Sequence, residues 1–440
     1  MAEAIGSDAD GADPKRPRPR RELTLFQAVA GTVVVALLTA VAVLAALIWW
    51  LGLSGKITQS TSAVISLIQL SFALVAGVGA VTGLVIAYRK HQLETGADAR
   101  EDQRLFNERF GTAATQLASD LPAIRLAGIY SMAGLADSWT DGRQQCIDVL
   151  CTNLRRAYAP EPPGTTSASF DADRVAWKDN QEFRHAIVRV VAERLRPDRE
   201  NSWQGHSFDF TGATFDGGDF SRIHVGTGTI LKFSEARFIG GSVSFASADI
   251  AGGTLELKRT QFDAGTIDFS GALLRDGVLD FTEARLSGGK LDFAAAQFLG
   301  GTLILFRAQF DGAGADFFGS RFLGSAVNLA QAVFKAGNTF LEQVEFRAGS
   351  IGFYATRFNG GAVSFTGSQF TGAGLMFEWA KFSGAEVDFR GAEFTGGTVD
   401  LSKAKVHANG PIFDFEPDQA PPGVLPPPGP ITEEEQPERG

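Results

Sequence analysis

The sequence is poor in the side chains that most often carry chemistry. Its 440 residues include two cysteines, three methionines, four tyrosines and five histidines. Cys146 and Cys151 make neither a disulfide framework nor a zinc motif, and we interpret them as reduced thiols of a helical core. A G-x-S-x-G motif, a P-loop and an H-E-x-x-H motif are all missing from the sequence. We therefore expect no enzyme, no cofactor and no metal ion.

The charge balance restricts the class of partner. The chain has 40 Lys and Arg against 50 Asp and Glu, a net charge of -10. A protein that binds nucleic acid usually presents a basic surface to the phosphate groups. We therefore do not expect a nucleic-acid partner.

Charge is missing altogether from two long stretches near the N-terminus. Residues 23–55 and 57–88 contain no charged side chain, and each run exceeds the ~20 apolar residues that cross a membrane. We predict a two-helix transmembrane hairpin over residues 23–90, after a basic tail over residues 1–22. Lys and Arg flank the pair of runs on both sides, which places both termini in the cytoplasm at the cell membrane.

The second uncharged run contains a small-residue motif. Gly79 and Gly83 form G-x-x-x-G, which predicts close packing of the two helices or self-association of protomers. Neither run carries an ionisable side chain. Since transport paths usually need such a group within the membrane, we interpret the hairpin as an anchor.

Residues 91–200 have the pattern of a small α-helical domain. Apolar side chains recur at helical spacing from Phe106 to Leu117, and Asp120 followed by Pro122 indicates the start of a new helix. A proline-rich interruption at residues 159–164 precedes a last helix near residues 179–196. At the other end of the chain, residues 411–440 are rich in proline and acidic residues, and we expect a disordered tail there.

Residues 207–410 repeat with a period of 12. One column of large apolar residues runs Phe245, Leu257, Phe269, Phe281, Phe293, Leu305, Phe317, Leu329, Leu341, Phe353, Phe365, Phe377, Phe389 and Leu401. Two further apolar columns and a column of alanine keep step with it, so that the unit reads V-x-F-x-x-A-x-F-x-G-G-x. A fixed period over this length is typical of a solenoid.

The unit itself predicts short strands and tight turns. V-x-F and A-x-F alternate, so each predicts a strand with its two apolar side chains pointing inward. The x-x pair and the Gly-Gly pair are the turns, because glycine tolerates a positive φ. One 12-residue unit per coil would give fourteen coils and a rod of about 65 Å. Two units per coil, or 24 residues with a squarer section, is the alternative that the sequence leaves open.

The repeat resembles that of the bacterial pentapeptide-repeat proteins. Phe245, Ile250 and Leu255 keep that family's step of five, and Ala248-Asp249-Ile250 and Ala315-Asp316-Phe317 are similar to its A-(D/N)-L core. The steps here run five, five, two rather than five throughout. The uncharged double run with RFGTAATQLASDLPAIRLAGIY (109–130) also resembles membrane-anchored members of actinobacterial type. The resemblance implies a β-helix and no shared catalytic residue. The fold class expected is thus an α+β membrane protein: transmembrane hairpin, small α-helical domain and pentapeptide-repeat-like β-solenoid.

Two outward patterns suggest binding surfaces. Ile304, Phe340 and Met376 recur every 36 residues, either because a three-unit block was duplicated or because they form an apolar interaction stripe. Outward acids such as Asp268, Asp280 and Asp292 are interpreted as a solvated face, with loose cation binding as the alternative.

We therefore expect a membrane-anchored, cytoplasm-facing scaffold that binds a protein partner. A membrane signalling or sensor component is one alternative. A DNA-mimic inhibitor of a nucleic-acid enzyme, a role attributed to some pentapeptide-repeat proteins, is another. A DNA mimic needs a strongly acidic rod, whereas residues 208–410 hold 21 acidic and 17 basic side chains.

Overall fold

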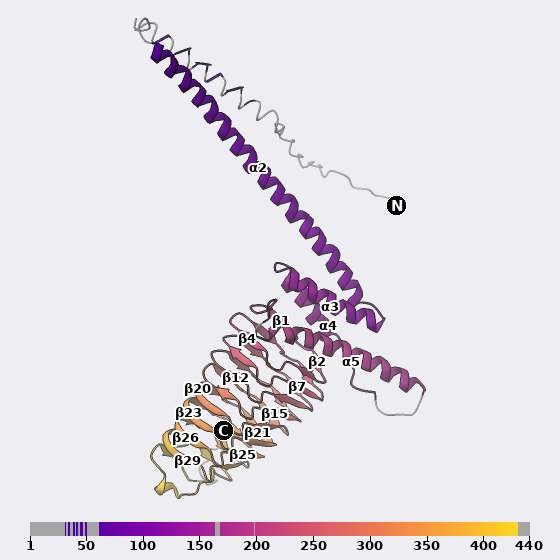
Figure 1. Cartoon of the computed structure of the whole chain (residues 1–440). Coiled ribbons are helices and arrows are strands. Elements are labelled where there is room, and N and C mark those ends of the chain that lie inside the picture. The colour runs from indigo at the N-terminus through magenta and orange to yellow at the C-terminus, as the bar shows by residue number, and fades with distance from the viewer. Residues whose placement is uncertain are drawn as a thin grey trace, which may run out of the picture. The chain divides into compact units, whose positions relative to one another are not determined.

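The computed structural model describes residues 61–162, 168–197 and 199–429, together with scattered positions between 31 and 50. The chain forms two compact units, Met1–Arg104 and Leu105–Gly440. The second unit contains a small helical part and a long β-solenoid (Figure 1).

The predicted transmembrane hairpin is corrected by the structure. In the part of the chain that is described, no helix has both the length and the apolar character that membrane crossing requires. The second predicted span belongs to α2 (Thr61–Leu117), which is a single helix of 57 residues. It continues without a break into the charged residues after 90, because a run without charge does not itself mark where a helix ends. The first predicted span, residues 23–55, falls largely outside the described residues.

The G-x-x-x-G glycines lie on α2 without a packing partner among the described residues. A Cβ atom added at Gly79 or at Gly83 would meet no atom within 4 Å. The predicted role of these two glycines in helix packing therefore stays a prediction.

The helical part of the second unit packs around one apolar core. It consists of the end of α2, α3 (Pro122–Ser138), α4 (Arg143–Arg155) and α5 (Ala168–Leu195). Phe106, Ala113 and Leu117 of α2 are buried in this core. Cys146 and Cys151 of α4 are buried thiols, and burial raises the pKa of Cys146 to about 11. Because the thiolate is the nucleophile, this environment makes Cys146 unreactive.

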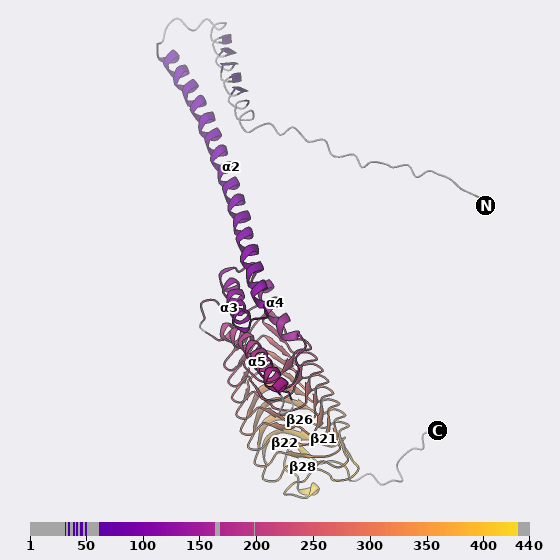
Figure 2. The ribbon, with the colours of Figure 1, turned by 90° about the vertical axis from the view of Figure 1, so that its right-hand side faces the viewer.

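Residues 207–425 form a β-solenoid of about nine coils, and the paired strands of successive coils run in parallel (Figure 2). This confirms the predicted solenoid and is consistent with a pentapeptide-repeat fold. Each coil passes along four faces, with a short strand on each face in the first coils and one longer strand spanning two faces in the later coils.

The first face contains β1 (Ser207–Asp209), β5 (Ile230–Lys232), β9 (Thr254–Glu256), β13 (Val278–Asp280), β17 (Thr302–Ile304) and, at its end, β31 (Val424–Leu425). The second contains β2 (Thr214–Phe215), β6 (Arg237–Phe238), β10 (Gln261–Phe262), β14 (Arg285–Leu286), β18 (Gln309–Asp311), β21 (Val333–Ala336), β24 (Arg357–Phe358), β27 (Lys381–Phe382) and β30 (Lys405–Val406). The third contains β3 (Gly218–Asp219), β7 (Ser242–Ser244), β11 (Thr266–Asp268), β15 (Lys290–Asp292), β19 (Gly314–Asp316), β22 (Asn338–Phe340), β25 (Ala362–Ser364) and β28 (Glu386–Asp388).

The fourth face contains β4 (His224–Gly226), β8 (Asp249–Ala251), β12 (Leu273–Leu274) and β16 (Gln297–Phe298). Four longer strands continue this face and run around its edge onto the first face: β20 (Arg321–Asn328), β23 (Glu345–Gly352), β26 (Gln369–Met376) and β29 (Glu393–Asp400). The fourth and first faces are thereby one sheet.

The strand register shows that one coil uses two repeat units. Ile267 pairs with Leu291, and Phe262 pairs with Leu286, which in each case lies 24 residues later in the sequence. The two 12-residue units of a coil therefore lie on opposite sides of the solenoid. At ~4.8 Å a coil, nine coils span about 43 Å, which is shorter than the rod expected from 12-residue coils.

Phenylalanine stacks fill the interior. Phe365 and Phe389 lie with ring centroids 4.4 Å apart and planes 2° from parallel, and Phe238 and Phe262 repeat the arrangement at 4.9 Å. Each ring stacks on the phenylalanine ring at the equivalent position of the previous coil. This is the physical reason for the unusual excess of phenylalanine, 36 residues in the chain.

Both ends of the solenoid are covered. At the first coil, α4 packs on β1 and α5 on β3, and the Gln144 amide exchanges hydrogen bonds of 2.8 and 3.1 Å with the backbone of Ser207. At the last coil, β31 pairs with β29, and the Phe413 ring stacks on Phe389 at 4.9 Å. Since open strand edges invite further pairing between chains, these contacts protect the edges that they cover.

Candidate functional site

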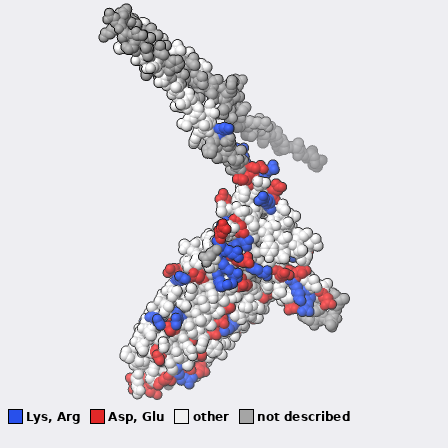
Figure 3. Space-filling view, in the orientation of Figure 1, with Lys and Arg blue, Asp and Glu red and all other residues white. Residues whose placement is uncertain are grey.

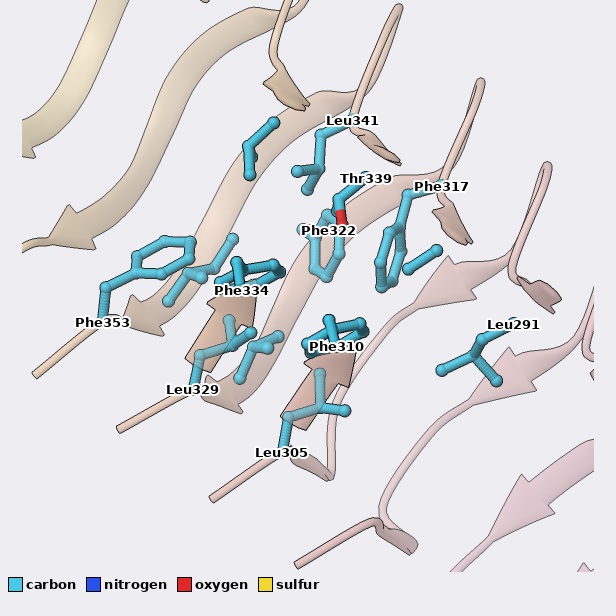
Figure 4. A pocket seen from close by; sticks show the side chains of 14 residues that line it. Leu291, Leu305, Phe310, Phe317, Phe322, Leu329, Phe334, Thr339, Leu341 and Phe353 are labelled. Carbon is cyan, nitrogen blue, oxygen red and sulfur yellow. The ribbon is translucent and has the colours of Figure 1, made fainter. Parts of the chain in front are cut away.

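A small packing defect lies in the interior of the solenoid. Ala315 and Thr339 occupy inward positions of β19 and β22 that neighbouring coils fill with Leu291 and Val363. Their smaller side chains leave a cavity of about 30 Å³ among leucine and phenylalanine side chains (Figure 4). This volume is near that of a single water molecule, and the surface of the cavity is apolar. The cavity is therefore a packing defect and not a site for an organic ligand.

The predicted apolar stripe is divided between two sheets. Ile304 ends β17 and Met376 ends β26, so both point outward from the first face, three coils apart. Phe340 ends β22 on the third face. The separation follows from the coil length, because 36 residues are one and a half coils. The structure therefore brings no two of these three residues into contact along a single row.

The outward aspartates of the V-x-F strands accept hydrogen bonds from the turns that follow them. The Oδ1 atom of Asp292 accepts a hydrogen bond of 2.9 Å from the backbone N–H of Ala294, at the start of the turn that follows. Asp268 and Asp280 do the same for the residue two positions later, at 2.9 Å in both cases. The aspartates of the acid column therefore cap turns.

The structure also separates the acids considered for a cation. Asp268 and Asp292 are neighbours on the third face, whereas Asp280 lies on the first. Lys290 donates to Asp292 and bridges to Asp316, each at 2.8 Å. Although partial burial opposes it, these contacts raise the pKa of Lys290. Within the described residues, no group of three or more His, Cys, Asp and Glu side chains has the arrangement of a metal site.

A polar cluster joins the helical part to the first coils. Asp216 accepts hydrogen bonds from Gln181 at 2.7 Å and from Tyr158, and its other oxygen lies 3.0 Å from His185 Nε2. Burial by itself would raise the pKa of Asp216, but hydrogen bonds from His185, Tyr158 and Gln181 lower it to about 2. Arg184, buried beneath, donates to the Thr214 carbonyl. Every partner belongs to α5, its preceding loop or the solenoid, so the cluster holds α5 in place.

The outer surface of the last coils combines cations with exposed apolar side chains. Arg357, Lys381 and Lys405 stand at equivalent positions of β24, β27 and β30 and pair in direct register. Tyr354, Met376 and Trp379, which are 49, 53 and 46% exposed, lie on the adjoining first face and its edge. The Lys405 ammonium lies 5.5 Å from the centroid of the Trp379 ring. We call these six residues the basic–aromatic surface.

The sequence analysis missed this surface because it compared the outward residues of successive 12-residue units. Outward residues of successive A-x-F strands belong alternately to the second and fourth faces, so cations of one face are interleaved with acids of the other. Reading only every second unit separates the second-face column: Arg237, Gln261, Arg285, Gln309, Val333, Arg357, Lys381 and Lys405. In its first part, cations alternate with glutamine, whereas its last three members are all cations. On the side of the solenoid that Figure 3 shows, the charged groups are separated by uncharged areas.

Comparison of the chain with protein-family models, with curated proteins and with solved structures finds no match.

Proposed function

We propose that this chain is a scaffold that binds a protein partner through the outside of its solenoid, and that it acts without catalysis. One observation carries the proposal: aromatic and methionine side chains stand exposed together on the side of a solenoid whose two ends are both covered. Tyr354, Met376 and Trp379 are each about half exposed. Side chains of this kind dominate the binding energy of protein interfaces.

The construction of the solenoid supports a binding role. Its interior is apolar and closely stacked, and turn residues are bound to backbone groups of the neighbouring coils. Such a surface loses little conformational freedom when a partner binds, which favours affinity. The resemblance to the pentapeptide-repeat proteins, whose solenoids have no shared catalytic residue, points in the same direction.

A capture experiment tests the scaffold role. The full chain is compared with a variant carrying Tyr354→Ser, Met376→Ser and Trp379→Ser, and with a control carrying Leu299→Ser, Phe318→Ser and Phe340→Ser. The control changes three residues of similar size that are also exposed, on the third and fourth faces. We expect the first variant alone to lose a saturable protein partner, with the β circular dichroism of all three proteins unchanged. Equal capture by all three, or no saturable capture by the full chain, would contradict the proposal.

A further inference from the structure

The three cations of the basic–aromatic surface have no counter-charge among the described residues. Arg357 and Lys381 are exposed and make no ion pair with any described residue, and Lys405 contacts only the face of Trp379. Adjacent strands stand ~4.8 Å apart, and like charges directly opposite each other in a sheet destabilise it. The surface therefore carries a repulsion that the rest of the described chain does not relieve.

Most other cations of the second face are paired or isolated: Arg285 has no ion pair among the described residues, but its neighbours in register, Gln261 and Gln309, are uncharged. On the third face, Asp268, Asp292 and Asp316 form a like-charge row of the same length, but Lys290 reaches two of them. On the second face, Arg237 bonds Asp263 and Lys335 bonds Asp311, at 2.6 and 2.8 Å. Arg357, Lys381 and Lys405 differ in forming a row of three like charges in register in which no member has an ion pair among the described residues, so carboxylates of another molecule can supply their counter-charges.

We infer that the basic–aromatic surface binds an extended acidic peptide segment of a partner protein, with carboxylates facing the three cations and apolar side chains facing Tyr354, Met376 and Trp379. The inference rests on the proposed function and names the chemistry of its partner. Carboxylate hydrogen bonds to Arg and Lys supply orientation, and desolvation of the aromatic groups supplies affinity.

The extent of the row favours a peptide over a nucleic acid. Three cations in register cover only about 10 Å, and the row stops at Val333 on one side and at the last coil on the other. A single-stranded nucleic acid needs a longer basic groove that follows its backbone. The net charge of -10 also repels a polyanion more strongly than it repels a short segment with three carboxylates.

Peptide binding to the full-length protein tests the inference. The probe is a fluorescein-labelled peptide of eight residues in which Glu and Leu alternate, measured by anisotropy, beside a peptide in which Gln replaces Glu and a labelled oligothymidylate of eight nucleotides. We expect saturable binding of the acidic peptide only, weakened as salt is raised. The variant Arg357→Gln, Lys381→Gln and Lys405→Gln should lose affinity by about tenfold or more, and Trp379→Ala by about threefold.

A charge-matched variant is the control. Arg237→Gln, Arg285→Gln and Lys335→Gln remove three cations from the same face, and affinity should change less than about twofold. Equal losses in the two triple variants, absence of saturable binding, or tighter binding of the oligonucleotide would overturn the inference. If changing Glu433, Glu434 and Glu435 to Gln raised the affinity for the acidic peptide more than threefold, the chain's own carboxylates would be the ligand of the surface. That result would also overturn the inference. The capture experiment and the peptide experiment can fail separately. If the Tyr354, Met376 and Trp379 variant loses the captured protein but the full chain binds no acidic peptide, the scaffold role stands and only the acidic segment is ruled out.

Discussion

The solenoid reverses its chain at two kinds of turn, and the two differ in what they tolerate. The corner turns follow the V-x-F strands, and eleven non-glycine residues adopt a positive φ there, among them Arg259, Ala295 and Ala355. The glycine turns precede the V-x-F strands, where Gly289 has φ 79° and lies against the carbonyl oxygen of Gly265 one coil earlier. An open corner therefore tolerates non-glycine residues in the left-handed conformation, whereas a turn at which two coils approach closely requires glycine.

The comparison explains why the outside of the solenoid can vary at some turns and not at others. A side chain at a corner turn projects into solvent, so the sequence there is free for charge or binding. A side chain at a glycine turn would push two coils apart. Tyr354 and Trp379 of the basic–aromatic surface both lie at corner turns, which is where the fold permits large exposed groups.

The largest effect is expected at a glycine turn. Gly289→Ala would add a Cβ that overlaps the Gly265 carbonyl, besides the cost of a left-handed alanine, so it should lower the free energy of unfolding by about 4 kcal/mol. The matched change at a corner, Gly319→Ala, has the same sign of φ but no atom within 4 Å of the new Cβ. It should cost about 1 kcal/mol. Denaturant titration measures both, and equal costs would remove the distinction between the turns.

A smaller loss is expected when a corner loses its side-chain cap. Asp292→Ala leaves the Ala294 N–H without its acceptor and frees Lys290 from one partner, which should lower the free energy of unfolding by about 1 kcal/mol. Asp292→Asn keeps the acceptor and should restore most of that loss. If the two variants unfold alike, the hydrogen bond to the turn is not what the acid contributes.

A gain is expected when glycine enters a corner. Ala355 has φ 53°, so Ala355→Gly relieves the left-handed strain while adding freedom to the unfolded chain. The balance should raise the free energy of unfolding by about 0.5 kcal/mol. A decrease in the denaturation midpoint would show that the Ala355 side chain packs usefully at its corner.

The smallest effect concerns pH at a corner. The hydrogen bond from Arg390 lowers the pKa of Asp388, so this carboxylate stabilises the fold above the unfolded-state pKa of about 3.9. The contribution is lost as the pH falls through the lowered pKa of the folded state. Asp388→Asn should therefore flatten the decline of stability below about pH 4.

The reciprocal change is Asn328→Asp. Asn328 already accepts the Ala330 N–H at 2.9 Å in the equivalent position, so the new carboxylate should steepen the same decline. Thermal denaturation across roughly pH 2–6, a range that brackets the pKa of a carboxyl group, measures both. Parallel curves for the two variants and the original chain would contradict the assignment.

The sequence predicted the solenoid because each repeated position has a fixed structural role in the coil. Inward positions such as Phe245 and Phe269 recur wherever a strand faces the interior, and the buried columns follow the expected positions closely. The hairpin prediction was wrong: it relied on the length of the uncharged runs and their basic flanks, whereas no described helix is long and apolar enough to cross a membrane and α2 runs from Thr61 to Leu117 as one helix. Placement of Ile304, Phe340 and Met376 could not be deduced, since it depends on how many units complete a coil.

The sequence by itself determined the period, the inward columns and the presence of tight turns, because these follow from side-chain alternation and local backbone preference. Only the tertiary structure decided the 24-residue coil. A 12-residue unit forms the same strands and turns whether a coil contains one unit or two, and only the strand pairing between successive coils distinguishes the two arrangements. That pairing put Phe340 on a different face from Met376 and gathered Arg357, Lys381 and Lys405 into one row. The basic–aromatic surface thus arises from the pairing of residues 24 positions apart, which no local pattern records.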